Sequence, residues 1–144
     1  MGTDTGADRG VTLVDTSTAI ALVVEDHEAH AVALAALKGR RLGLAGHAWF
    51  ETYSVLTRLP SGLRRSPEDA LRLLNRNFPA TRFLGEEGAS LLGRELARLG
   101  ISGGAIYDAL IAAAARQHGL TLVSADTRAR PVYETLGVQL EFLP

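Results

Sequence analysis

Cysteine is absent from this 144-residue chain, and lysine is almost absent, since fourteen of the fifteen basic side chains are arginines and Lys38 is the exception. The lack of cysteine excludes a disulfide framework and any zinc site built from thiolates, and it favours a cytoplasmic protein. The scarcity of lysine means that any contact with phosphate groups would have to come from arginine.

Long apolar runs are missing as well. The longest, such as 109–115, are far shorter than the roughly 18 residues that a membrane span requires, and the opening MGTDTGADRG has no apolar signal core. The formal net charge of −1 gives no overall attraction to nucleic acid. We therefore expect no membrane contact, a flexible tail at residues 1–10 and a single domain at residues 11–144.

Short apolar runs, several rich in β-branched residues, alternate with segments of helical periodicity along the chain. This alternation predicts an α/β protein, a three-layer α/β/α sandwich around a parallel sheet of about five strands, because parallel strands need crossover connections and become buried. The expected strands are 11–14, 41–46, 80–85, 120–126 and 138–143, and the expected helices are 16–24, 26–39, 47–60, 66–78, 86–100, 102–119 and 127–137.

Four carboxylates stand in unusual places in this pattern. Asp15 and Asp126 directly follow buried strands, where open parallel sheets bind their ligands. Glu51 lies on an apolar row of its helix, and Asp108 has no basic residue within one helical turn. Each has an ordinary alternative: the two strand-end aspartates would serve as caps of the turns that follow them, and Glu51 would extend to the surface.

Carboxylates brought together need a counter-charge. Two of them about 5 Å apart repel by roughly 3 kcal/mol at an effective dielectric constant of about 20. Hard oxygen ligands select Mg²⁺ or Mn²⁺, which lower the pKa of a bound water and stabilise the oxygens of an in-line phosphoryl displacement. The four acids together therefore predict metal-dependent phosphoryl chemistry.

The ordered series LVDTS, FETYSVLTRL, YDALIAAAA and LVSAD resembles the PIN-domain ribonucleases, and most closely the VapC-type toxins of bacterial toxin–antitoxin modules, from about Val11 to Leu143. The resemblance implies a Mg²⁺- or Mn²⁺-dependent endoribonuclease that cleaves RNA and is covered by a VapB-type antitoxin, as a homodimer or a toxin–antitoxin hetero-oligomer. The residues that it implies for catalysis are Asp15, Glu51, Asp108 and Asp126, with Asp15, Asp108 and Asp126 on the metal and the hydroxyls of Ser17 and Ser124 in support.

The chain departs from this family after Asp126, where it reads DTRARPVY and lacks the phenylalanine that many relatives place about three residues on. Two other classes that gather acids at strand ends fit less well. A haloacid-dehalogenase phosphatase has a second aspartate where Ser17 stands, and a receiver domain needs a late lysine. A non-catalytic PIN-like module that binds RNA or protein remains an alternative, which the presence of all four acids disfavours.

Two further surfaces are predicted. Arg65, Arg72 and Arg76 recur at spacings of seven and four around the helix at 66–78, which would let them follow an RNA backbone, unless they belong to an ordinary solvated face. Apolar residues at 19–24 and 49–59 exceed what the sheet can cover and would form a groove for an amphipathic segment of the antitoxin.

Overall fold

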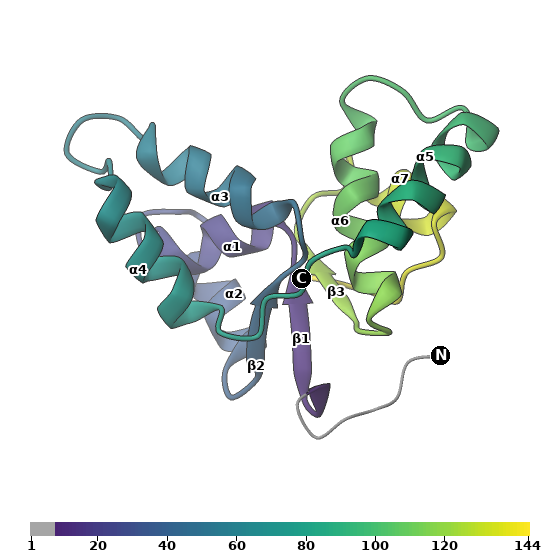
Figure 1. Cartoon of the computed structure of the whole chain (residues 1–144). Helices are drawn as coiled ribbons and strands as arrows, with labels where there is room; N and C mark the ends of the chain where they lie inside the picture. The colour runs from purple at the N-terminus through teal and green to yellow at the C-terminus, as the bar shows by residue number, and fades with distance from the viewer. Residues whose placement is uncertain (1–7) are drawn as a thin grey trace.

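The computed structural model describes residues 8–144. In these residues a four-stranded sheet is surrounded by seven helices (Figure 1). The elements follow in the order β1 (Val11–Val14), α1 (Thr16–Val23), α2 (His30–Leu37), β2 (Arg41–Leu44), α3 (Ala48–Thr57), α4 (Pro67–Asn77), α5 (Glu86–Leu99), α6 (Ala105–Gln117), β3 (Leu122–Ser124), α7 (Arg130–Thr135) and β4 (Leu140–Phe142).

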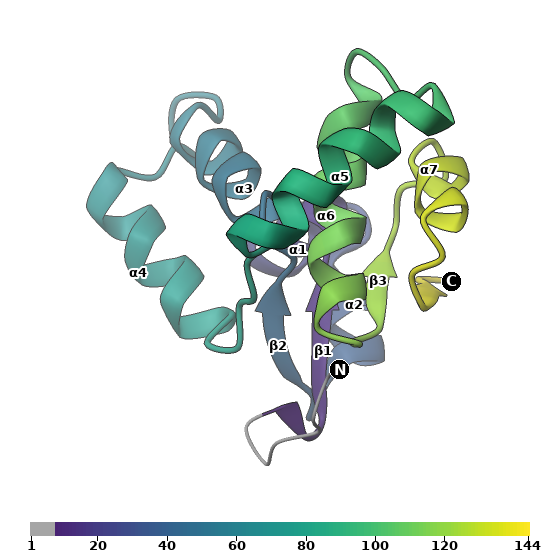
Figure 2. The same ribbon diagram turned by 45° about the vertical axis from the view of Figure 1, so that its right-hand side comes forward.

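The sheet has the order β2-β1-β3-β4, and all of its pairs are parallel. Figure 2 shows α5 and α6 in front of the strands and α1 and α2 behind them, so helices cover both faces. All four residues of β1 are buried, as expected for an inner strand covered on both faces. The predicted α/β/α architecture is confirmed.

The expected strand at 80–85 is reduced to one bridge between Arg82 and Ala45, beside the outer edge of β2. The Ala80 N–H donates to the Leu42 carbonyl at 3.0 Å, but the Leu44 N–H donates to the Thr81 hydroxyl rather than to a backbone carbonyl. A side chain therefore replaces part of the ladder, and the segment lies along the edge without becoming a fifth strand.

The expected helix at 26–39 begins only at His30. Residues 26–29 form turns in which the His27 ring accepts a hydrogen bond from the Ala29 N–H at 3.0 Å. The sequence pattern predicts this helix correctly over its apolar part and wrongly over its polar start, where a side-chain acceptor competes for the backbone.

Two sequence expectations concern the ends and the membrane. Residues 1–7 of the expected tail lie outside the described residues. Asp8, the first residue that the structure describes, forms an ion pair with Arg82 at 2.7 Å. No helix within residues 8–144 is long and apolar enough to cross a membrane.

Gly43 in β2 allows the 80–82 segment to approach the strand. A Cβ atom at this position would lie 2.1 Å from the Ala80 carbonyl oxygen, which is backbone and cannot rotate away. We expect Gly43→Ala to lower the free energy of unfolding by about 2 kcal/mol because the two backbones would have to separate. Gly93→Ala in α5, where a Cβ meets nothing within 4 Å, should raise it by up to about 1 kcal/mol. Urea unfolding of both variants tests this, and equal effects would contradict the close approach.

Candidate functional site

Asp15 is the N-cap of α1 and is almost completely buried, with 1% of its surface exposed. Its Oδ1 accepts hydrogen bonds from the Ser17 hydroxyl at 2.7 Å and the Thr18 N–H at 3.0 Å. Its Oδ2 accepts from the Ser124 hydroxyl at 2.5 Å and the Tyr133 hydroxyl at 3.0 Å. The cap interpretation is correct, and the carboxylate also joins β1 to β3 and α7.

The hydroxyls of Ser17 and Ser124 each link Asp15 to the loop that follows β3. Ser17 accepts the Ala125 N–H at 3.2 Å, and Ser124 accepts the Asp126 N–H at 3.0 Å, while both donate to Asp15. The position of the Asp126 backbone therefore depends on the Asp15 carboxylate. The two serines predicted to support the site therefore hydrogen-bond both to Asp15 and to the backbone that carries Asp126.

Glu51 lies in the first turn of α3 and is half-buried. Its Oε1 accepts a hydrogen bond from the Thr16 hydroxyl at 3.3 Å. Burial raises the pKa of the Glu51 carboxyl above its ordinary value, and the charges of Asp108 and Asp15 add to this increase, against the lowering effects of His47 and Thr16. Glu51 is therefore not an acid extended freely into solvent, and it feels the negative charge of its neighbours.

Asp108 lies in the first turn of α6 and is buried. The basic partner missing from its own helix is supplied by Arg128, which follows β3, with 3.2 Å between Nη1 and Oδ2. The other terminal nitrogen of Arg128 contacts Asp126 Oδ2 at 3.0 Å, so one guanidinium bridges two of the four acids. The hydrogen bond with Asp108 raises the pKa of Arg128, which therefore stays charged.

Asp126 caps the turn that leads into α7, as the ordinary interpretation holds. Its Oδ1 accepts the Arg128 N–H at 2.9 Å and the Ala129 N–H at 3.3 Å. Its Oδ2 is left to Arg128 and to the cavity. The cap fixes the carboxylate in place, so capping and a role in the site are compatible.

The four predicted acids line one cavity of about 240 Å³ at the carboxyl ends of β1 and β3. Its lining also contains Thr16, Ser17, Ile111, Arg128 and Tyr133. Within residues 8–144, no three acidic or histidine side chains are arranged so as to ligate one ion, and the Arg128 guanidinium instead bridges Asp108 and Asp126. The oxygen atoms of this lining nevertheless fit a hard divalent cation, because they belong to carboxylates and hydroxyls. The charges of Asp108 and Asp15 also contribute to the raised pKa of Glu51, although burial is its largest cause.

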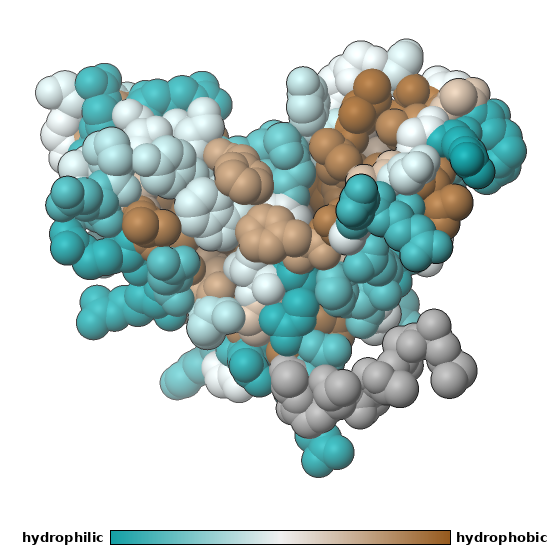
Figure 3. Space-filling model, viewed as in Figure 1, coloured by the Kyte–Doolittle hydropathy of each residue, from teal (hydrophilic) through white to brown (hydrophobic). Residues whose placement is uncertain are grey.

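Exposed aromatic side chains directly precede two of the acids in the sequence. Phe50, which precedes Glu51, lies with its ring 6.0 Å from that of Phe83, and Tyr107, which precedes Asp108, stacks on His47 at 5.1 Å. Phe50, Phe83 and Tyr107 are each about half exposed. Figure 3 shows apolar side chains in the hollow between the part of the molecule with α3 and α4 and the part with α5 and α6.

The three predicted RNA-binding arginines are not in one cavity. Arg72 and Arg76 line a cavity of about 430 Å³ with Asp69 and Leu73, and Arg72 forms an ion pair with Asp69. Arg65, which precedes α4, lines a different cavity. The structure thus brings two of the three together.

Sequence reasoning missed Tyr133 and Arg128. Tyr133 is buried, and burial together with the charge of Asp15 raises its pKa far above the ordinary value, so its hydroxyl stays protonated and donates. The sequence of α7 is mostly polar, so it gives no signal that Tyr133 is buried and that its hydroxyl needs a partner. Arg128 gave no signal either, since it reaches Asp108 across twenty positions of the sequence.

Comparison with known proteins shows which family this sequence belongs to. The model of the PIN domain family matches residues 12–134. Ribonuclease VapC27 of Mycobacterium tuberculosis (strain ATCC 25618 / H37Rv) is 50% identical over 127 residues, which cover 88% of this chain and 93% of that protein. Ribonuclease VapC40 of Mycobacterium tuberculosis (strain CDC 1551 / Oshkosh) is 38% identical over 131 residues, which cover 90% of this chain and 96% of that protein.

Two solved structures share the fold at low identity. A chain in the crystal structure of VapBC2 from Rickettsia felis bound to a DNA fragment from their promoter has a TM-score of 0.66 and 16% identity, covering 93% of this chain and 99% of that one. A chain of FitAB bound to the IR36 DNA fragment has a TM-score of 0.64 and 20% identity, covering 92% and 94%. From the family match and the two mycobacterial relatives, we conclude that the chain belongs to the PIN-domain family, in its VapC ribonuclease group.

Proposed function

We propose that this VapC-family chain is a Mg²⁺- or Mn²⁺-dependent endoribonuclease and the toxin of a toxin–antitoxin pair. The observation that carries the proposal is that Asp15, Glu51, Asp108 and Asp126, from four separate segments, line one cavity at the end of a parallel sheet. The names of the relatives with 50% and 38% identity support ribonuclease activity.

Asp15, Asp108 and Asp126 are the residues that would hold the ion. A divalent cation bound there supplies a water of lowered pKa and stabilises the attacking and leaving oxygens. We expect Glu51, whose pKa is raised by burial and whose Oε1 accepts a hydrogen bond from Thr16, to accept the proton of the attacking water. Ser17, Ser124 and Tyr133 act by holding Asp15.

In the proposed reaction, water attacks the phosphorus of the RNA backbone and the bond from phosphorus to O3′ breaks. The leaving O3′ takes up a proton from solvent and Glu51 returns the proton of the attacking water to solvent, so that the products carry a 5′-phosphate and a 3′-hydroxyl. The RNA 2′-hydroxyl takes no part in this displacement. A nuclease that used the 2′-hydroxyl as its nucleophile would leave a 2′,3′-cyclic phosphate instead.

The product ends give a direct test of the proposal. An RNA oligonucleotide with a single 2′-deoxy residue on the 5′ side of the scissile phosphate should still be cut by the purified chain, and the new 5′ end should accept ligation without prior phosphorylation. Loss of cleavage on that substitution, together with a cyclic phosphate on the unsubstituted RNA, would show that water is not the nucleophile.

A phosphatase mechanism with Asp15 as the nucleophile is less well supported. Both oxygens of Asp15 already accept two hydrogen bonds each, and the carboxylate is almost fully buried. Attack on phosphorus would require one oxygen to lose its donors and reach the substrate. Coordination of an ion by Asp15 would also require one oxygen to give up a donor, so this observation counts against the nucleophile only together with Ser17, which stands where these phosphatases have a second aspartate. The non-catalytic binding module is disfavoured by the four carboxylates in the cavity, for which a binding role alone gives no use.

Arg72 and Arg76 are proposed as contacts to the RNA backbone. We expect the double variant Arg72→Ala, Arg76→Ala to bind RNA more weakly, because each lost phosphate contact should lower the slope of log affinity against log salt by about 0.7 for a single strand. Fluorescence anisotropy with a single-stranded oligonucleotide between low and moderate salt measures this slope. Arg94→Ala, Arg98→Ala on α5 is the matched control, and an unchanged slope in the first variant would assign its arginines to a solvated face.

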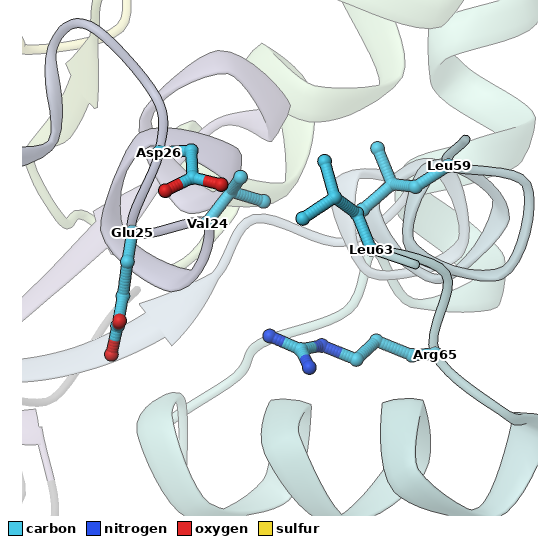
Figure 4. Close-up of a pocket in the computed structure, with 6 residues that line it drawn as sticks. All are labelled: Val24, Glu25, Asp26, Leu59, Leu63 and Arg65. Carbon is cyan, nitrogen blue, oxygen red and sulfur yellow. The ribbon is translucent and has the colours of Figure 1, made fainter. Parts of the chain in front are cut away.

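A groove at the ends of α1 and α3 is proposed as the antitoxin site. Its cavity of about 320 Å³ is lined by the apolar residues Val24, Leu59 and Leu63 and by the charged residues Glu25, Asp26 and Arg65. Figure 4 shows Leu59 and Leu63 facing Val24 across the opening, with Arg65 at its side. An amphipathic helix with a basic face fits this combination of leucines and acids. The assembly named VapBC2 in the structure that shares this fold supports a VapB-type partner.

Leu63 is 41% exposed, so it can be changed with little effect on folding. We expect Leu63→Asp to weaken binding of the purified cognate antitoxin at least tenfold, because it places a charge in the apolar part of the groove. Leu91→Asp on α5, which is 55% exposed and outside this groove, is the control. Isothermal titration measures the affinity of both variants for the antitoxin, and equal affinities would show that the antitoxin does not bind in this groove.

A further inference from the structure

Arg128 places a positive charge of the chain itself on the proposed metal ligands. Its guanidinium contacts Asp108 Oδ2 at 3.2 Å and Asp126 Oδ2 at 3.0 Å, and it belongs to the lining of the acidic cavity. Two of the three carboxylates that would hold the ion are therefore already paired, whereas Asp15 is held by uncharged donors alone.

The guanidinium can leave without unfolding its surroundings. Its side chain is 70% exposed, whereas Asp108 is only 11% exposed and stays where α6 holds it. The backbone of Arg128 is fixed separately, because its N–H donates to Asp126 Oδ1 at 2.9 Å and the next residue, Ala129, is buried. Only side-chain rotation is needed to open the two carboxylates to solvent.

A guanidinium and a divalent cation compete for the same carboxylates. Both bind through the oxygen lone pairs, and two positive groups within a few ångströms of each other repel. We propose that Arg128 is an internal counter-ion, which neutralises Asp108 and Asp126 in the metal-free protein and is displaced from them when a divalent cation binds. The inference rests on the proposed function, since it takes these carboxylates to be the metal ligands.

This exchange makes the affinity for metal lower than the carboxylates alone would give. Part of the attraction between the ion and the carboxylates is used to break the contacts of Arg128. A neutral side chain at position 128 removes both the competitor and the repulsion, so it should strengthen metal binding. If Arg128 merely held the ligands in place, the same substitution would weaken metal binding.

Isothermal titration of Mn²⁺ into the metal-stripped full chain tests the proposal. Arg128→Gln should bind Mn²⁺ about tenfold more tightly than wild type. The affinity of Arg128→Lys, which keeps the charge but loses the planar guanidinium that contacts both carboxylates, should lie between those two. Arg98→Gln is the matched control, because Arg98 is also 70% exposed and pairs only weakly, at 3.9 Å, with Glu95 outside the cavity. Its affinity should equal that of wild type.

Thermal unfolding gives a second measurement that needs no RNA. In chelator, Arg128→Gln should melt below wild type, because Asp108 and Asp126 lose their counter-charge, and saturating Mn²⁺ should remove or reverse the difference. Equal or weaker Mn²⁺ binding by Arg128→Gln would overturn the exchange while leaving the metal site in place. Absence of Mn²⁺ binding in wild type and in all variants would overturn the proposed metal site and the exchange with it.

Discussion

Asp108→Asn is expected to reduce RNA cleavage at least about 10³-fold and to leave the protein folded. The substitution keeps the shape of the side chain but removes one of the negative charges that would hold the divalent ion, and a loss of about 4 kcal/mol of transition-state stabilisation corresponds to this factor. Among the described residues, the side chain of Asp108 accepts its hydrogen bonds from Arg128 and does not connect several elements as Asp15 does. The variant therefore separates chemistry from folding.

Stability should change by less than about 1 kcal/mol in the same variant, because Arg128 is mostly exposed and its ion pair is screened. Removal of the charge also relieves its repulsion with Glu51. Glu134→Gln, an exposed acid that pairs with Arg130 outside the cavity, is the matched control and should cleave as wild type does. Retention of more than a tenth of wild-type activity by Asp108→Asn at equal Mg²⁺ would be incompatible with a role in holding the ion.

Asp15→Asn should lower the free energy of unfolding by about 3 kcal/mol as well as abolish cleavage. An asparagine offers one acceptor oxygen where the carboxylate offers two, and four donors converge on the side chain. At least one pair of donors would face an NH₂ group, and a buried donor without an acceptor costs about 1–3 kcal/mol. Urea unfolding measures the loss, and Tyr133→Phe, which removes one donor, should cost about 1 kcal/mol.

The sequence alone supports the opposite expectation for Asp15, namely that neutralising one of four clustered acids relieves repulsion and stabilises the metal-free protein. The surroundings of the two carboxylates differ, because Asp15 accepts hydrogen bonds from uncharged donors of three elements whereas Asp108 contacts Arg128. We therefore expect a large loss of stability for Asp15→Asn and only a small change for Asp108→Asn. A variant Asp15→Asn that is more stable than wild type in chelator would show that repulsion outweighs the four hydrogen bonds.

The buried strands and the strand-end positions of Asp15 and Asp126 could be predicted because they depend on local patterns. An apolar run followed by an acid is visible within a few residues, and parallel pairing brings such ends to one edge of the sheet. The wrong prediction of a strand at 80–85 also has a physical reason. The Leu44 N–H donates to the Thr81 side chain, whereas in a regular strand it would donate to a backbone carbonyl. No local pattern in the sequence indicates which group will accept the hydrogen bond of the Leu44 N–H.

The partners of the acids could not be predicted, because they come from distant segments. Arg128 does not lie on the helix of Asp108, so the sequence around Asp108 does not indicate it as a partner. Tyr133 contacts Asp15 across 118 positions of the sequence. The sequence therefore predicts that the four acids line one cavity, but not that Arg128 and Tyr133 line it with them, and not how the charges are balanced before a metal binds.

The dependence of RNA cleavage on divalent ions tests the central claim most directly. The full chain, stripped of metal and assayed in excess chelator on a single-stranded RNA, should show no cleavage above that of Asp108→Asn. Addition of Mg²⁺ or Mn²⁺ beyond the chelator should restore cleavage in wild type and leave Asp108→Asn inactive. Equal cleavage by wild type with and without chelator would contradict the account, because the proposed mechanism takes its attacking water from a bound cation.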